Sequence, residues 1–148
     1  MTISKEKRVD PQALAPAERR LVARARRAAK HAYAPYSVFR VGAAVATASD
    51  AVFTGANVEN ASYGLTICAE RVAVSAAVAA GHRRLQTIAV VSGDGEPAAP
   101  CGACLQVLRE FGAPNMTVLL GPLRGRSAAV RTTLGALLPR TFQLPATP

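Results

Sequence analysis

The sequence contains no tryptophan, and aromatic residues make up only 5% of it. Because proteins that bind single-stranded nucleic acids stack the bases on aromatic side chains, this scarcity argues against that function. No glycine-rich phosphate-binding loop stands out either. No apolar run approaches the ~18 residues that a transmembrane helix needs, and the polar N-terminus lacks the apolar core of a signal peptide. We therefore expect no signal peptide and no membrane partner.

Acidic residues are also few: nine Asp and Glu accompany 18 Lys and Arg, and the formal net charge is +9. Residues 1–31 contribute two thirds of this excess, with nine basic and three acidic residues. A basic chain raises the question of a nucleic-acid partner or of the steering of anionic ligands. The concentration of the charge in one segment, together with the scarce aromatic residues, favours a solvated helix surface instead. We do not expect a nucleic-acid partner.

Cysteine occurs three times in the 148 residues. This small, odd number argues against the disulfide framework of secreted domains, and unpaired thiols are typical of a reducing compartment. The length is close to that of one domain and allows a core without disulfides. We expect a cytoplasmic protein with a single domain over residues 16–148, preceded by a flexible N-terminal arm at residues 1–15.

The pattern of apolar residues predicts an α/β fold. A helix begins after Pro16 and ends at Pro35. Two strand-like runs flank a turn at residues 49–50 and predict a hairpin over 39–46 and 51–56. Farther along, helices are predicted over 68–80, 101–111 and 134–138, and strands over 86–92, 116–120 and 128–132. This order predicts a three-layer α/β/α sandwich, with the sheet between two layers of helices.

The three cysteines lie at the starts of two predicted helices. Cys101 and Cys104 form a C-x-x-C pattern directly after Pro100, and Cys68 begins the other helix. Residues three apart share a helix face, and the positive end of the helix dipole favours thiolates. Three sulfur ligands suit Zn²⁺, and a set of three rather than four leaves a coordination position for water, as in catalytic zinc sites. A redox-active C-x-x-C with one further buried cysteine is the alternative.

Two charged residues follow Cys68 in the segment C-A-E-R. Glu70 is placed to take a proton from a zinc-activated water and to deliver it to a substrate. The alternative for Glu70 is a surface position that the helix dipole favours. Arg71 is expected to donate hydrogen bonds to the thiolates and to offset their negative charge, and its alternative is a side chain that faces solvent.

Six segments of the chain carry a resemblance to a known family. They are C-A-E-R at 68–71, P-C-G-A-C at 100–104, Y-A-P-Y-S-V-F-R-V-G-A-A at 33–44, N-V-E-N-A-S-Y at 57–63, Q-V-L-R-E-F-G at 106–112 and L-L-P-R-T-F at 137–142. Together they resemble the small, zinc-dependent cytidine deaminases, whose zinc motifs are a variant of those in nucleobase deaminases generally. The resemblance implies a mixed five-stranded sheet and a homotetramer whose active sites are completed by neighbouring subunits.

The resemblance also implies roles for the matching residues. One zinc ion per chain binds to the three cysteines, and Glu70 is the proton shuttle. Asn57 and Glu59 bind the ribose, Phe39 packs against the pyrimidine ring, and the backbone of Ala69 contacts the polar edge of that ring.

Three further positions match residues that, in the family, act at or across a subunit boundary. Ala61 and Tyr63 reach a neighbouring active site, and Phe142 closes a neighbour's pocket. Ordinary core packing is the alternative for Phe39, Tyr63 and Phe142.

The reaction implied is the hydrolytic deamination of cytidine and deoxycytidine to uridine and deoxyuridine, with release of ammonia, as in pyrimidine salvage. Glu70 accepts the water proton, protonates N3 of the cytosine and then protonates the departing amine. Three alternatives stay open. Blasticidin-S deaminases lack the N-V-E-N-A-S-Y pattern, polynucleotide deaminases usually have histidine in place of Cys68, and a zinc-stabilised binding module needs a fourth protein ligand.

Overall fold

A mixed six-stranded sheet forms the middle layer of the structure, a computed structural model that describes residues 7–125 and 129–145. Its strands are β1 Lys7–Val9, β2 Val41–Thr47, β3 Val52–Ala56, β4 Leu85–Ser92, β5 Gly112–Gly121 and β6 Ala129–Thr133. They lie in the order β1-β6-β5-β4-β2-β3. β4 and β5 are parallel, and every other neighbouring pair is antiparallel.

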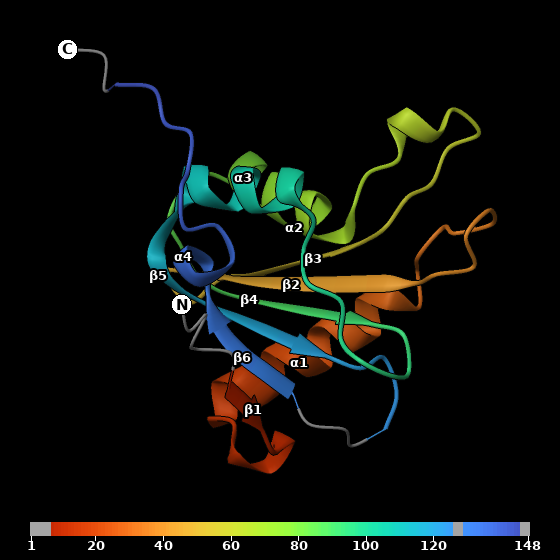
Figure 1. Ribbon diagram of the computed structural model, residues 1–148, viewed down its shortest axis with the longest axis horizontal. Helices are drawn as coiled ribbons and strands as arrows, with labels where there is room; N and C mark the ends of the chain where they lie inside the picture. Colours follow the sequence, from red (N-terminus) through yellow and green to blue (C-terminus); the bar gives the residue numbers. More distant parts are fainter. Residues whose placement is uncertain (1–6, 126–128, 146–148) are drawn as a thin grey trace.

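Helices cover both faces of the sheet (Figure 1). Helix α1, Pro16–Ala29, packs on one face, and α2 Ala69–Ala79, α3 Gly102–Phe111 and α4 Leu134–Leu137 pack on the other. Two short 3₁₀ helices, Pro11–Ala13 and Tyr63–Leu65, lie in the connections. The predicted α/β/α sandwich is confirmed. No helix among the described residues is both long and apolar enough to cross a membrane.

The central strand β4 shows how the sequence divides the core into two layers. Successive side chains of a strand point to opposite faces. Ile88 and Val90 accordingly pack with α2 and α3, whereas Ala89 and Val91 pack with α1. A strand buried on both faces needs a nearly continuous apolar run, and this is why β4 was recognisable from the sequence.

The strand count differs from the five that the family resemblance implied. The sixth strand is β1, which pairs antiparallel with β6 through Lys7–Arg131, Arg8–Val130 and Val9–Ala129. It lies within residues 1–15, where a flexible arm was expected, and Leu14 of the same segment is buried against the α1 face of the core. The strand is held by backbone pairing at a sheet edge rather than by buried side chains. Its sequence K-R-V therefore shows no alternation of apolar residues from which a strand could be predicted.

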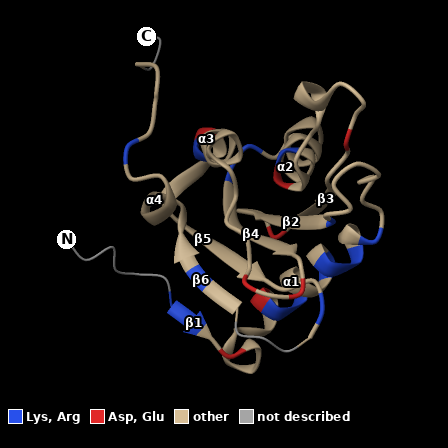
Figure 2. Cartoon of the chain, turned by 45° about the vertical axis from the view of Figure 1, so that its right-hand side comes forward, with Lys and Arg blue, Asp and Glu red and all other residues tan. Residues whose placement is uncertain are grey.

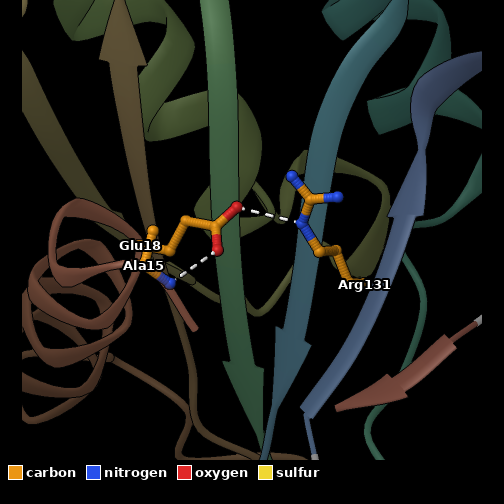
Figure 3. A network of polar contacts seen from close by, with 3 residues as sticks. All are labelled: Ala15, Glu18 and Arg131. Carbon is orange, nitrogen blue, oxygen red and sulfur yellow. Dashed lines mark hydrogen bonds and ion pairs between the residues drawn. The ribbon is translucent and has the colours of Figure 1, made fainter. Parts of the chain in front are cut away.

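The first turn of α1 is held by a charged side chain, as Figure 3 shows. Glu18 accepts a hydrogen bond from the backbone N–H of Ala15 (3.1 Å) and forms an ion pair with Arg131 of β6 (3.0 Å). The helix ends at Ala29, earlier than the expected end at Pro35. Residues after the helix instead turn toward the sheet, where Tyr33 pairs with Val58.

Two glycines allow the helices to approach the sheet closely. A Cβ on Gly55 of β3 would lie 2.5 Å from the backbone nitrogen of Ala73 in α2, and Gly42 of β2 faces the backbone of α1 in the same way. Only a residue without a Cβ fits such contacts. The close approach at Gly55 places the first turn of α2 directly over the edge of the sheet where β3 and β4 end.

Candidate metal centre and active site

A cavity of about 260 Å³ opens at this edge of the sheet. It is lined by the start of β2, the ends of β3 and β4 and the first turns of α2 and α3, through Ser37, Phe39, Val41, Asn57, Glu59, Thr66, Cys68, Ala69, Glu70, Val90, Ser92, Ala98, Ala99 and Cys101. Five of the residues predicted from the sequence to bind substrate or move protons therefore meet in one cavity: Phe39, Asn57, Glu59, Ala69 and Glu70. A larger concavity of about 520 Å³ beside α1 contains no cysteine or histidine.

The three cysteines come together beside this cavity, which Cys68 and Cys101 line. Cys68 caps the N-terminus of α2, Cys101 caps the N-terminus of α3, and Cys104 lies in the first turn of α3. Their sulfur atoms all lie within 4.8 Å of one another. Cys68, which lies 33 positions before Cys101 in the sequence, is thus brought together with the C-x-x-C pair as predicted.

The surroundings of the sulfur atoms fit a soft divalent cation. Both helix N-termini direct their positive dipole ends at the cluster. Hydrogen bonding from the backbone N–H of Cys104 lowers the pKa of the Cys101 thiol. Burial, followed by the charge of Glu70, raises the pKa of the Cys104 thiol. A thiolate at Cys104 therefore needs a nearby positive charge, which zinc bound by three sulfur atoms supplies.

Arg71 lies beside the cluster. Its Nη2 donates to the carbonyl oxygen of Thr66 (3.3 Å) and lies 3.7 Å from the sulfur of Cys68. Its Nε is buried and has no hydrogen-bond partner among the described residues. The contact with Cys68 raises the pKa of the guanidinium, so this side chain carries a fixed positive charge next to the thiols.

Glu70 is the buried carboxyl group of the site. Its side chain is only 5% exposed and lines the cavity together with Cys68. Burial raises its pKa, although the charge of Arg71 opposes this shift. A raised pKa makes the carboxylate a stronger base, which suits a group that must accept a proton and return it.

Asn57 shapes the wall on which Phe39 lies. Its amide oxygen accepts from the N–H of Val41 (2.9 Å), and its amide nitrogen donates to the carbonyl oxygen of Phe39 (2.9 Å). The side chain is 8% exposed. Asn57 therefore fixes the backbone on both sides of residue 40 while it lines the cavity.

Glu59 is bound to the loop that precedes Phe39. It accepts hydrogen bonds from the hydroxyl of Ser37 and from the backbone N–H groups of Tyr36 (2.9 Å) and Ser37 (3.2 Å). The hydroxyl of Ser37 is the main reason why the pKa of Glu59 is lowered. The carboxylate is thus held ionised at the rim of the cavity, beside Tyr36 and Tyr63.

The remaining expected site residues lie outside this cavity. Ala61 is exposed. Tyr63 is 74% exposed and packs on Tyr36, with ring centroids 5.7 Å apart. Phe142 is 71% exposed, and its carbonyl oxygen accepts from Gln106 (2.9 Å). Within one chain, none of these three residues lines the cavity. The high exposure of Tyr63 and Phe142 rules out the alternative that they pack in the core.

Sequence reasoning missed seven residues that line the cavity: Ser37, Val41, Thr66, Val90, Ser92, Ala98 and Ala99. Ser92 ends a buried strand that leads to the C-x-x-C segment, and side chains at the carboxyl ends of sheet strands commonly form binding crevices. That position was the available signal for Ser92. The two alanines carry no chemical signature, because only the path of the loop brings them to the cavity.

Comparison with known proteins gives a consistent result. The family model described as "Cytidine and deoxycytidylate deaminase zinc-binding region" matches residues 16–120. A cytidine deaminase of Halalkalibacterium halodurans is 46% identical over 122 residues, which are 82% of this chain and 91% of that protein. A cytidine deaminase of Mycobacterium tuberculosis is 47% identical over 81% of this chain and 85% of its own length. The crystal structure of a cytidine deaminase from Burkholderia pseudomallei superposes with a TM-score of 0.78 at 50% identity, over 83% of this chain and 97% of that chain.

Proposed function

The chain belongs to the cytidine and deoxycytidylate deaminase family, and on this basis we propose that it catalyses the hydrolytic deamination of cytidine and deoxycytidine. The products are ammonia and uridine or deoxyuridine, a reaction of pyrimidine salvage. The observation that carries the proposal is the meeting of three thiols and the buried carboxyl group of Glu70 beside a single cavity. Family membership also makes the chain a zinc-binding hydrolase.

The proposed zinc ligands are Cys68, Cys101 and Cys104, with one ion per chain. When bound, zinc activates a water molecule for attack at C4 of the cytosine ring. Arg71 offsets part of the negative charge of the thiolates through its contact with Cys68. Less negative charge remains on the metal, which keeps it an effective Lewis acid.

Glu70 is the proposed acid and base. Its carboxylate would take one proton from the attacking water and give it to N3 of the ring. It would then take the remaining proton from the hydroxyl formed at C4 and carry it to the amine, so that ammonia leaves as the C4 carbonyl forms. Burial keeps bulk water away from these transfers and raises the pKa of the carboxyl group toward the value that proton exchange requires.

The nucleoside is proposed to lie along the opposite wall. Phe39 packs against the pyrimidine ring, while Asn57 and Glu59 bind the ribose and the backbone of Ala69 contacts the polar edge of the base. Support comes from the position of these residues in one cavity. The amide group of Asn57 can both donate and accept hydrogen bonds, and the ionised Glu59 offers an acceptor to sugar hydroxyl groups.

We further propose a cytoplasmic homotetramer in which Ala61, Tyr63 and Phe142 complete the active sites of neighbouring subunits. Their exposure in the single chain supports this role, because large apolar side chains favour burial in an interface. One domain is proposed that contains β1 and Leu14 as well as the expected residues 16–148, because β1 pairs with β6 and Leu14 packs in the core.

The decisive experiment compares the wild-type chain with Glu70→Gln. Turnover is followed through the loss of cytidine absorbance, and bound zinc is measured by elemental analysis. We expect about one zinc per chain in both proteins and a loss of activity by a factor of at least ~10²–10⁴ in Glu70→Gln, the usual cost of removing an acid–base group. The exposed Glu110→Gln on α3 is the matched control and should keep wild-type activity.

Full activity of Glu70→Gln would contradict the proposed mechanism. Zinc at one ion per wild-type chain without any turnover of cytidine or deoxycytidine would contradict the proposed function and would favour a zinc-stabilised binding module.

A further inference from the structure

The loop that joins β4 to α3, residues 93–100, separates the cavity from the N-terminal strand. Ala98 and Ala99 of this loop line the cavity, and Cys101 follows it directly. Its middle, residues 94–96, is exposed. The position of the loop therefore affects one wall of the cavity and the placement of Cys101 at the start of α3.

On its inner side the loop is attached at two points. The hydroxyl of Ser92 accepts a hydrogen bond from the N–H of Ala98 (3.3 Å). Gly93 has a φ of +56°, and a Cβ at this position would lie 3.6 Å from the ring of Phe39. Gly93 thus lies near the same aromatic residue that is proposed to contact the pyrimidine.

On its outer side the loop is attached to β1. The guanidinium of Arg8 donates to the carboxylate of Glu96 at 2.5 Å. Among the described residues Glu96 has no other ion-pair partner. Because β1 is antiparallel to β6, and β6 is antiparallel to β5, β1 runs in the same direction as β4 and β5. It therefore delivers Arg8 toward the edge of the sheet at which the loop and the cavity lie.

From these contacts we propose that Arg8 is a positioning residue for the substrate cavity, acting through Glu96 on the β4–α3 loop. The proposal rests on the proposed function, since it takes the cavity to be the nucleoside site. β1 lies outside residues 16–120, which the family model matches, so this contact comes from an N-terminal segment beyond the matched region. Figure 2 shows basic residues on β1 at the margin of the sheet.

The expected effect is small, because both side chains are about two thirds exposed, at 66% and 68%. An exposed ion pair corresponds to a change of roughly two- to five-fold in an equilibrium constant. We expect this change in KM for cytidine, since the loop shapes the wall, and little change in kcat, since Glu70 and the thiols lie on α2 and α3.

The experiment uses the full chain loaded with zinc and the variants Arg8→Ala, Glu96→Gln and the charge swap Arg8→Glu with Glu96→Arg. Two readouts are combined: KM and kcat for cytidine, and hydrogen–deuterium exchange of residues 93–99 without substrate. Arg8→Ala and Glu96→Gln should each raise KM about two- to five-fold and speed exchange in the loop. The charge swap should restore both values. Arg131→Ala, which removes the similar ion pair to Glu18 on α1, should change neither.

Unchanged KM and unchanged loop exchange in Arg8→Ala would overturn the proposal, as would equal effects of Arg131→Ala. Loop exchange is measured without turnover. An inactive wild-type protein would therefore contradict the proposed function, while the exchange data would still test the Arg8–Glu96 contact separately.

Discussion

The acidic groups of the thiol cluster need positive charge beside them in the folded protein. Cys104 is fully buried, and Glu70 and two further thiols lie close to it. Ionising several of these groups in the protein interior is costly unless positive charge is nearby. Arg71 supplies one such charge, and the proposed zinc supplies the rest. The metal is therefore expected to contribute to folding as well as to the reaction.

This argument predicts the behaviour of Cys104→Ser. Replacing one thiolate should weaken zinc binding by more than the ~10–100-fold that is typical for changes to an outer partner of a ligand, and it should lower the thermal midpoint. Zinc content after dialysis and competition with a zinc indicator measure the first effect, and thermal unfolding measures the second. Ala103→Ser places a hydroxyl at an exposed position of the same turn and serves as the control. Equal zinc affinity in Cys104→Ser and the wild-type chain would refute the ligand assignment.

Which residues of the site could be recognised from the sequence depended on their chemistry. The cysteines and Glu70 were recognisable because metal ligands and an acid–base group need particular side chains at particular spacings. The contacts of Asn57 with Phe39 and of Ser37 with Glu59 were not, because they depend on how residues 34–40 cross the end of β3. The family resemblance identified Phe39, Asn57 and Glu59 as site residues, but it did not predict these hydrogen bonds.

Among the elements of the fold, α2 has the closest link to the site. Its first turn carries Glu70 and is capped by Cys68. The helix can lie close to the sheet because Gly55 has no side chain. Close packing on the sheet restrains the position of α2. It therefore also restrains the carboxyl group of Glu70 and the thiol of Cys68 at the start of this helix.

Gly55→Ala should therefore destabilise the protein and impair the site together. The added methyl group would overlap the backbone of Ala73, and overpacking of this kind costs about 1–3 kcal/mol. Urea unfolding measures the stability, and the activity assay measures the displacement of α2. Gly64→Ala is the matched control, since nothing lies within 4 Å of a Cβ at that position. A Gly55→Ala protein with wild-type stability would show that the helix can shift without cost.

Most elements were predictable because their patterns are long. The predicted strand over 86–92 and the helices over 68–80 and 101–111 agree with β4, α2 and α3 to within a residue at each end. β5 begins at Gly112, whereas the predicted strand began at residue 116. The earlier start was not predicted, because Ala113, Pro114 and Asn115 have no strand-like composition of their own. β1 was missed for the same reason.

Within residues 7–125 and 129–145, the large exposed apolar side chains belong to three segments of the chain. The large exposed side chains are Tyr33, Tyr36, Val38, Phe39, Val58, Tyr63, Leu65, Ile67, Phe142 and Leu144. Several are neighbours, since Tyr36 packs on Tyr63 and Val58 pairs with both Tyr33 and Ile67. A monomer rarely exposes a contiguous surface of this kind, and the proposed tetramer would bury it next to the active site.

The proposed assembly predicts a particle with four times the mass of one chain. Light scattering coupled to gel filtration measures this directly, and a monomer at micromolar concentration would contradict it. If Phe142 closes a neighbouring site, Phe142→Ala should raise KM for cytidine while zinc content stays the same. Glu110→Gln, at an exposed position of α3, is the control and should leave KM unchanged.

The position of β1 at one margin of the sheet has a consequence for solubility and partner choice. An edge strand with free backbone groups invites another chain to add a strand. β1 occupies the edge of β6, and in the part of the chain that the structure describes it spans three residues, two of which are Lys7 and Arg8. Short length and positive charge discourage the addition of a further strand. This margin is thus protected against aggregation, and association between copies is directed to side-chain packing on other surfaces rather than to extension of the sheet.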